Sequence, residues 1–192
     1  MGKVIAIDGP SGAGKGTIAK LLAGELGFSY LDTGALYRAV ALALREKGIN
    51  PEDSDEKLKN TLSVTDVSFK NGKVSLNGRD VSEEIRTTEM GHYSSVFSAR
   101  KVVRDFLLDI QRSASLNADL VAEGRDMTTV VFPDAWKKFY LDASVEERAK
   151  RRYLQLKEKG INITESEAKK DVVERDVRDS GRDIAPLRKA DD

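Results

Sequence analysis

The stretch Gly9-Pro10-Ser11-Gly12-Ala13-Gly14-Lys15-Gly16-Thr17 decides the fold of this chain. It follows an apolar run at 4–7 and leads into an amphipathic run at 18–26. A strand, a glycine-rich turn and a helix are the context of a phosphate-binding P-loop. The glycines let successive backbone N–H groups point at one anion, and the helix N-terminus adds its dipole. Lys15 supplies positive charge for the terminal phosphates of a nucleoside triphosphate.

Two details of the motif narrow its meaning. A dinucleotide-binding fingerprint fits worse, because the third glycine is mis-spaced and that motif has no lysine. The common P-loop places Ser or Thr directly after the lysine, where the hydroxyl binds magnesium. Here Gly16 occupies that position and the hydroxyl comes at Thr17. We therefore expect no direct side-chain ligand, with Mg²⁺ held by phosphates and water, because this cation keeps its water tightly.

The composition excludes several classes of protein. The chain has 192 residues, no cysteine and a single histidine, His92, which argues against disulfides, a zinc site and a histidine-based triad. Lys plus Arg equals Asp plus Glu at 32 each, which argues against a general nucleic-acid binder. No apolar run approaches the roughly 20 residues that span a bilayer, and the N-terminus lacks a signal-peptide pattern. We expect a cytoplasmic monomer with neither nucleic-acid nor membrane partners.

The rest of the chain predicts an α/β protein with a parallel sheet flanked by helices. Strands are expected at 28–31, 120–122 and 139–141, besides the one before the P-loop. Asp32-Thr33-Gly34 offers an N-cap for a helix at 35–47. Capping boxes at Ser144/Glu147 and Thr164/Glu167 predict helices that reach about 159, where Gly160 ends the first, and about 179.

An insertion is predicted between the second and third core strands. Residues 51–66 are polar and suggest a short helix with loops, and 82–116 are rich in helix signals. Between them, apolar residues alternate over 67–81, and Asn71-Gly72 and Asn77-Gly78 interrupt the alternation. Asn-Gly between alternating runs is the strongest short hairpin signal, so we predict a small three-stranded antiparallel sheet.

Three stretches follow predicted core strands and should therefore line one crevice, since parallel sheets bind ligands at the carboxyl ends of their strands. These are the P-loop, 32–34 and 123–126. Seven arginines fall between Arg148 and Arg188, although the net charge is zero. Arginine binds phosphate bidentately and stays charged, as transfer of a phosphoryl group between two nucleotides requires. Each feature also has a plain structural explanation: a solvated salt-bridged helix face, an ordinary cap, or a strand-end turn.

Six motifs carry a resemblance that covers essentially the whole chain, in order. Gly-Pro-Ser-Gly-Ala-Gly-Lys-Gly-Thr stands at 9–17, Asp-Thr-Gly-Ala-Leu-Tyr-Arg at 32–38, Gly-Arg-Asp-Met at 124–127, Val-Val-Phe-Pro-Asp-Ala at 130–135, Arg-Asp-Val-Arg-Asp-Ser-Gly-Arg at 175–182 and Ala-Pro-Leu at 185–187. Together they resemble the bacterial cytidylate kinases. The small sheet at 67–81 matches that family's enlarged monophosphate-binding insert.

The resemblance implies transfer of the ATP γ-phosphate to CMP or dCMP. It implies a kinase core at about 1–32, 117–145 and 161–192, an insert at about 33–116 and a lid at about 146–160. ATP would meet the P-loop and the lid residues Arg148, Arg151 and Arg152. The CMP phosphate would meet Thr33, Tyr37, Arg38, Arg125 and Arg182, the ribose Arg175 and Asp179, and the cytosine Ser95, Arg104 and Asp126. Lys15, Arg125 and Arg182 would be the catalytic residues.

The chain departs from the family pattern at two places. Thr128 stands where glycine is expected after Gly-Arg-Asp-Met, and a β-branched residue narrows the conformations open to that loop. The family also continues past Asp192 into another strand and a closing helix. We therefore expect a processed or incompletely described chain that lacks this strand and helix, with less stability than a longer form.

Three other functions compete with this interpretation. A GTP-driven switch should carry an Asn-Lys-x-Asp guanine reader, which the sequence does not contain. A P-loop kinase for another small acceptor, such as shikimate or gluconate, would not explain the inserted sheet and the arginine-rich C-terminal helix. A non-catalytic nucleotide-binding fragment is suggested by the early end of the chain.

Overall fold

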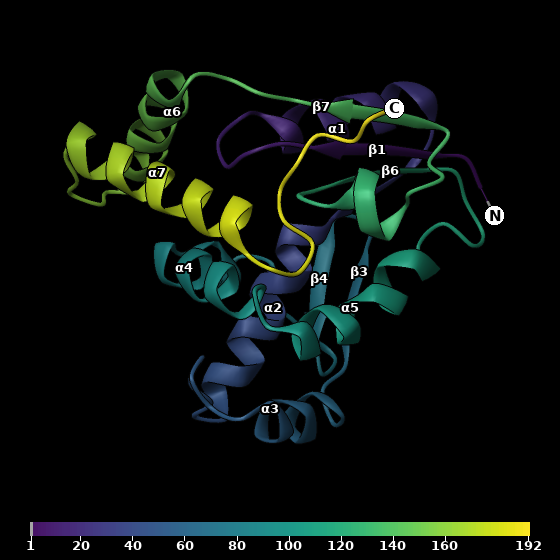
Figure 1. The fold of residues 1–192 in the computed structure, drawn as a ribbon, viewed down its shortest axis with the longest axis horizontal. Coiled ribbons are helices and arrows are strands. Elements are labelled where there is room, and N and C mark those ends of the chain that lie inside the picture. The colour runs from purple at the N-terminus through teal and green to yellow at the C-terminus, as the bar shows by residue number, and fades with distance from the viewer. Residues whose placement is uncertain (1) are drawn as a thin grey trace.

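The structure is a computed structural model that describes residues 2–192. Its helices and strands alternate along the chain, with two short helical turns, η1 and η2, among them (Figure 1). Their bounds are β1 Val4–Asp8, α1 Lys15–Leu26, β2 Ser29–Asp32, α2 Thr33–Glu46, α3 Asp55–Leu62, β3 Val67–Lys70, β4 Lys73–Leu76, β5 Arg79–Asp80, η1 Glu84–Arg86, α4 Thr88–Phe97, α5 Lys101–Ser113, β6 Leu120–Gly124, η2 Met127–Val131, β7 Lys137–Tyr140, α6 Val145–Glu158 and α7 Glu165–Gly181.

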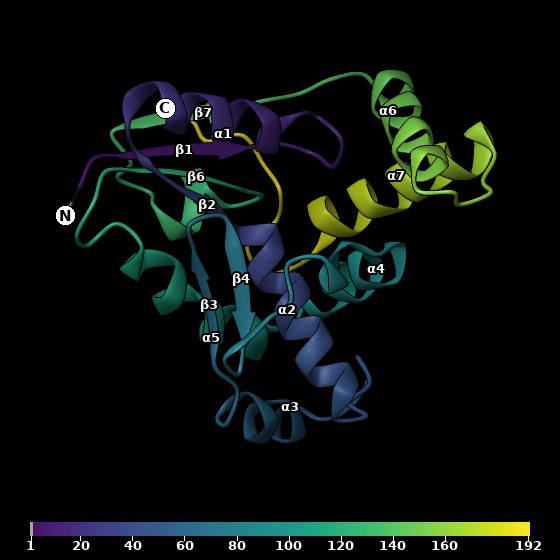
Figure 2. The same cartoon turned by 180° about the vertical axis from the view of Figure 1, so that it is seen from behind.

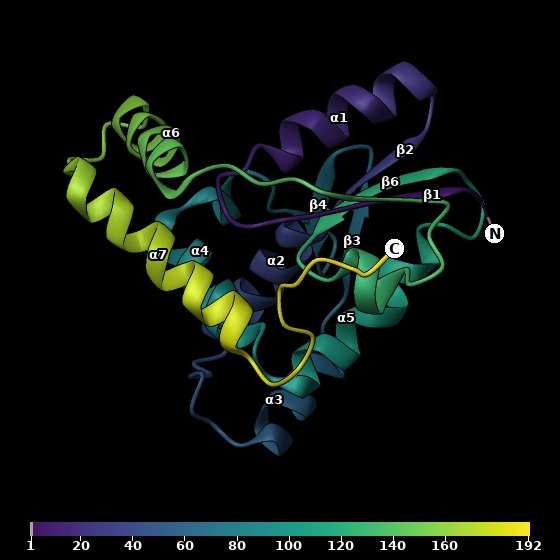
Figure 3. The same cartoon turned by 45° about the horizontal axis from the view of Figure 1, so that its top comes forward.

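The central sheet is parallel and has the strand order β2-β6-β1-β7 within the described residues. Its register pairs Val4 with Leu120 and Ile5 with Lys137. Side chains alternate across the sheet: Ile5 and Ile7 join a core under α1, whereas Val4 and Ala6 join the larger core with α2 and α5. Figure 3 shows α1 on one side of the sheet and α2 with α5 on the other. The predicted fold class is therefore confirmed.

The inserted region forms its own small sheet, in the antiparallel order β3-β4-β5. Both Asn-Gly pairs adopt the left-handed backbone that a tight hairpin needs, with φ of 53° and 76° at the first pair and 49° and 79° at the second. Val67, Val74 and Leu76 are buried against the core that α2 shares. Figure 2 shows the small sheet beside α2, with α3 at the far end.

The helices α6 and α7 pack against each other and project away from the sheet (Figure 3). The capping box at Thr164 and Glu167 is present in full. The one expected at Ser144 is only half formed, since Ser144 Oγ accepts from the Glu147 backbone N–H while the Glu147 carboxylate pairs with Arg151 instead. The segment after α7 returns to the sheet, where Asp192 contacts Lys138 of β7 (Figure 1).

Two elements, α2 and β7, begin earlier in the structure than the sequence predicts. The second helix begins at Thr33 rather than Ala35, because the Asp32 side chain accepts from the Ala35 backbone N–H and starts the helix earlier. The last core strand begins at Lys137, where it pairs with Ile5. Within residues 2–192, no helix combines the length and apolar character needed to cross a bilayer.

Candidate active site

A cavity of about 920 Å³ lies at the carboxyl ends of β1, β2 and β6, between the P-loop, α4 and the α6–α7 pair. This is at the upper end of the volumes usual for small-molecule sites. Eighteen of the predicted site residues line it. They are Ser11, Gly12, Ala13, Gly14, Lys15, Gly16, Thr17, Thr33, Tyr37, Arg38, Ser95, Arg104, Arg125, Asp126, Arg151, Arg175, Asp179 and Arg182. Segments more than a hundred residues apart in the chain thus meet at one place.

The P-loop curls around the N-terminus of α1. Gly14 is the N-cap and has φ 98°, a conformation that favours glycine. Lys15 is 5% exposed, and its Nζ donates to the Pro10 carbonyl oxygen at 2.8 Å. Burial, with Arg125 nearby, lowers the pKa of Lys15 to about 7. The lysine is therefore held inside the loop, where a phosphate group would restore its charge.

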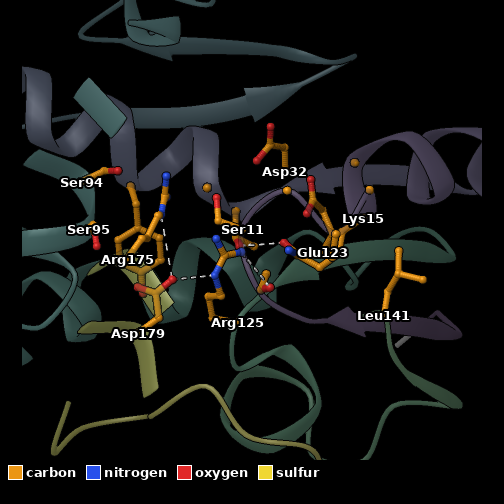
Figure 4. A pocket seen from close by; sticks show the side chains of 18 of the residues that line it. Ser11, Lys15, Asp32, Ser94, Ser95, Glu123, Arg125, Leu141, Arg175 and Asp179 are labelled. Atoms are coloured by element: carbon orange, nitrogen blue, oxygen red, sulfur yellow. Dashed lines mark hydrogen bonds and ion pairs between the residues drawn. The ribbon is translucent and has the colours of Figure 1, made fainter. Parts of the chain in front are cut away.

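A second group of charges faces the P-loop across the cavity. Arg125 Nε donates to Asp179 Oδ2 at 2.8 Å, and Arg175 Nε lies 4.0 Å from the same oxygen (Figure 4). Burial and the charge of Arg125 lower the pKa of Arg175 to about 10. These two arginines share one carboxylate, so the group carries excess positive charge and suits an anion.

Asp126 lines the cavity between two further arginines. Its carboxylate pairs closely with Arg104, and its other oxygen lies 3.9 Å from Arg182 Nη2. Arg104 also donates to the Ser98 carbonyl oxygen at 3.1 Å and lies over the Tyr37 ring at 5.5 Å. Asp126 and both its partners are largely buried, so this corner has a fixed pattern of charge.

Four buried polar atoms of the cavity have no hydrogen-bond partner among residues 2–192. They are Arg38 Nε, Ser95 Oγ, Arg175 Nε and Arg182 Nη2. A buried donor without a partner is costly, and such atoms mark positions where a ligand completes the hydrogen bonding. All four belong to residues expected at the acceptor nucleotide, which supports a polar ligand at this end.

The end of β2 and the end of β6 meet beside the P-loop. Thr33 Oγ1 donates to the Glu123 carbonyl oxygen at 2.7 Å, and Arg38 Nη2 donates to Asp32 Oδ2 at 3.4 Å. Tyr30 donates its hydroxyl to Glu123 Oε1 at 3.2 Å. Burial and the nearby Asp32 carboxylate raise the pKa of Glu123, whereas the Lys15 charge opposes this. Two carboxylates thus stand next to the phosphate-binding loop.

The three lid arginines differ in position. Arg151 lines the cavity, and its Nη1 donates to the carbonyl oxygens of Gly12 and Ala13. Arg148 is buried: its Nη2 pairs with Asp176 of α7 at 2.7 Å, and its Nη1 donates to the Ser11 carbonyl oxygen at 3.2 Å. Arg152 pairs with Asp171 at 2.9 Å. Arg148 and Arg152 therefore hold α6 and α7 together and do not line the main cavity.

Gly9 and Pro10 are likewise absent from the cavity lining, since they form the base of the loop. Several lining residues were not predicted from the sequence: Ser94, Ser98, Asp142, Gln155 and Glu158. Asp32 and Glu123 belong to the two strand-end stretches that were predicted to line the crevice, and both line it. Ser94 and Ser98 lie on the same helical turn as Ser95 or the next one, so helical spacing could have indicated them. The lid residues Gln155 and Glu158 carried no such signal.

Comparisons with known proteins decide the family. The family model described as cytidylate kinase matches residues 5–192. The chain belongs to the cytidylate kinase family. Membership confirms the resemblance and the prediction of an ATP-dependent phosphotransferase that acts on nucleoside monophosphates.

Curated relatives agree over nearly their whole length. The cytidylate kinase of Thermodesulfovibrio yellowstonii is 55% identical over 100% of this chain and 88% of its own length. The cytidylate kinase of Geobacter sulfurreducens is 52% identical over 100% of this chain and 83% of its own length. The one of Thermotoga maritima is 44% identical over 100% of this chain and 87% of its own length. Among solved structures, a shikimate kinase from Acinetobacter baumannii matches 91% of this chain and 74% of its own at 15% identity and TM-score 0.40. The protein TT1252 from Thermus thermophilus matches 96% of this chain and 85% of its own, with 22% sequence identity and a TM-score of 0.44.

Proposed function

We propose that the protein transfers the γ-phosphoryl group of ATP to CMP or dCMP, giving ADP and CDP or dCDP. One observation carries this proposal. A P-loop and a second cluster of largely buried arginines line a single cavity, which also presents the carboxylate of Asp126. Two phosphate sites in one enclosed space suit a donor and an acceptor that must be held in line.

We assign the donor to the P-loop, residues 9–17, together with the lid. Backbone N–H groups of the loop and the N-terminus of α1 would hold the phosphates. Lys15 would leave the Pro10 carbonyl and pair with the terminal phosphates. Arg151 would exchange its loop carbonyl contacts for the nucleotide, while Arg148 and Arg152 keep the lid helices in place.

We assign the acceptor phosphate to Thr33, Tyr37, Arg38, Arg125 and Arg182. Arg38 Nε and Arg182 Nη2 have no hydrogen-bond partner among residues 2–192, which supports this assignment. Arg175 and Asp179 would meet the ribose. Ser95, Arg104 and Asp126 would meet the cytosine, whose amino group is a donor that Asp126 can accept. Uracil has no such donor, which gives a physical reason for a cytosine preference.

The chemistry is stabilisation of charge that spreads over the transferring phosphoryl group. Lys15, Arg125 and Arg182 would supply positive charge around that group, so we propose these three as catalytic residues. Their burial strengthens each interaction, because little water screens it. Closure of the α6–α7 pair over the cavity would exclude water from the reaction.

We propose Mg²⁺ as the cation that accompanies ATP. Among residues 2–192 no group of three or more His, Cys, Asp or Glu side chains is arranged to hold a metal ion. Thr17, Asp32 and Glu123 do line the cavity beside the loop, so oxygen donors are present for a hydrated ion bound mainly to phosphates. When bound, the ion would neutralise phosphate charge. We also propose that the enzyme works as a cytoplasmic monomer, since one chain supplies the whole cavity.

A substrate panel tests the proposal. Purified protein is mixed with ATP, Mg²⁺ and each of CMP, dCMP, UMP, AMP, GMP and shikimate, and ADP release is followed in a coupled assay. We expect CMP or dCMP to be fastest, UMP slower, and activity to vanish with EDTA. Faster phosphorylation of AMP or shikimate than of CMP would overturn the proposal.

A further inference from the structure

One buried cluster of hydrogen bonds joins β1, the strand before the P-loop, to the segment that follows β6. Asp8 is the last residue of β1 and directly precedes the P-loop. Its carboxylate is fully buried and accepts three hydrogen bonds: from the Met127 backbone N–H at 2.9 Å, the Thr128 backbone N–H at 2.7 Å and the Thr128 hydroxyl at 2.6 Å. These partners are 119 and 120 residues away along the chain.

The two residues that donate to Asp8 stand at the start of an unusual turn. Residues Met127–Val131 form a π-helical turn, in which the Val131 N–H donates to the Asp126 carbonyl oxygen at 3.0 Å and the Phe132 N–H donates to that of Met127 at 2.8 Å. Such wide turns are rare and are frequent at functional sites. The two residues before the turn are Arg125 and Asp126, whose side chains line the cavity.

The turn is held at both ends. At its far end Arg112 of α5 donates to the carbonyl oxygens of Val130 and Val131, each at 3.0 Å. At its near end the Asp8 carboxylate is the acceptor. The near end decides where Arg125 and Asp126 stand, because they are continuous with it. Asp8 itself is fixed, since β1 pairs with β6 and β7 on its two sides.

We infer that Thr128 is a positioning residue for the phosphoryl transfer: its hydroxyl, bound to Asp8, fixes Arg125 and Asp126 relative to the P-loop. This inference rests on the proposed function. Thr128 itself does not line the cavity, so it acts through its neighbours. The P-loop keeps its own backbone contacts without it, so the donor site should be less sensitive to Thr128 than the acceptor site.

The chain offers a matched control beside it. Thr129 is the next residue of the same turn, and its Oγ1 is buried without a hydrogen-bond partner in the described part of the chain. Replacing Thr129 by Val changes the same atoms at the next position but removes no hydrogen bond. Thr128→Ser keeps the hydroxyl, whereas Thr128→Val and Thr128→Ala remove it.

The experiment compares these four variants with the intact protein in steady-state kinetics. We expect Thr128→Val and Thr128→Ala to raise the KM for CMP about tenfold and to lower kcat, with the KM for ATP within about twofold. Thr128→Ser and Thr129→Val should behave as the unaltered protein. Equal changes for ATP and CMP, no change for CMP, or the same loss in Thr129→Val would overturn the inference.

Amide hydrogen exchange supplies a readout that does not depend on activity. The Met127 and Thr128 amides should be protected in the unaltered protein and should lose about tenfold of that protection in Thr128→Ala, while amides of α1 keep theirs. Unchanged protection at both amides would refute the role of the hydroxyl. Failure of the unaltered protein to phosphorylate CMP would instead refute the proposed function, and the exchange result would still decide the positioning.

Discussion

The state of Lys15 illustrates how a buried residue can be prepared for a ligand. Its Nζ donates a hydrogen bond to the Pro10 carbonyl oxygen, and burial and the nearby Arg125 lower its pKa to about 7. Phosphates bound in the loop would favour the charged form and raise this pKa. The proton taken up on binding makes the affinity for ATP depend on pH.

The sign of this dependence follows from linkage. At pH 8 most free enzyme has neutral Lys15, so ATP binding should take up about one proton, and affinity should fall as pH rises above about 7. Titration calorimetry in two buffers of different ionisation enthalpy at pH 8 measures the uptake. Lys15→Arg, whose charge is permanent, should take up about none. Proton uptake near zero in the unaltered protein would contradict the prediction.

Asp126 is the residue that should decide the choice of base. Ala at this position would leave Arg104 and Arg182 buried without their carboxylate, so a loss of activity would be hard to assign. Asp126→Asn keeps the shape and adds an amide donor that can face the uracil carbonyl. We expect the kcat/KM ratio of UMP to CMP to rise about tenfold or more. Coupled assays with both substrates measure it.

Arg38 supplies the control for this substitution. We propose Arg38 as a ligand of the acceptor phosphate, so it should take no part in reading the base. Arg38→Met should lower kcat/KM for CMP and UMP by the same factor, since a phosphate contact carries no base information. An unchanged UMP to CMP ratio in Asp126→Asn, or a changed one in Arg38→Met, would move base selection to other residues.

At the scale of elements, α6 and α7 are joined by ion pairs of unequal burial. Arg148–Asp176 is the buried pair, with side-chain exposures of 5% and 23%, whereas Lys169–Glu146 is exposed at 52% and 71%. Removing one partner of a buried pair leaves the other charge buried without a counter-charge, which lowers the free energy of unfolding. An exposed pair contributes little to that free energy. Only the first pair should matter for the stability of the lid.

Urea unfolding should separate the two pairs. Asp176→Ala should lower the free energy of unfolding by about 3 kcal/mol, because Arg148 keeps its burial but loses its carboxylate. Lys169→Ala should change it by about 0.5 kcal/mol or less. A loss of equal size in both variants would show that burial does not distinguish them.

Much at this scale could be predicted from the sequence, because local signals decide it. The Asn-Gly turns and the full capping box at Thr164 are contacts between residues close in the chain. The π-helical turn after Asp126 and the buried position of Arg148 could not be predicted. Both depend on partners far away in sequence, Asp8 for the first and Ser11 with Asp176 for the second. The carboxyl ends of the strands were predictable as a site, whereas the pairing of charges within it was not.

At the scale of the whole molecule, zero net charge conceals a local excess. Arg38, Arg125, Arg175 and Arg182 line one cavity, with Asp179 shared between two of them. Gathering like charges in a buried place opposes folding, and an anionic ligand relieves that repulsion. Ligand phosphate should therefore stabilise the folded protein more than the nucleoside part does.

Thermal melts test this expectation. CMP at about 100 times its Kd should add about 2.7 kcal/mol of stability, which raises the midpoint by about 5–10 °C for a domain of this size. Cytidine at the same concentration lacks the phosphate and should raise it by about 1 °C or less. Equal shifts for both would mean that the arginine cluster does not recognise the phosphate.

The helix α7 both holds α6 in place and supplies side chains to the cavity. Its 17 residues span about 25 Å. Its Asp171 and Asp176 hold α6, while Arg175 and Asp179 of the same helix line the cavity. Because α7 is one continuous helix, a tilt that moves α6 toward the proposed ATP site would also move Arg175 and Asp179 at the proposed CMP site. Occupancy of either nucleotide site should therefore alter affinity at the other, by the same factor in both directions.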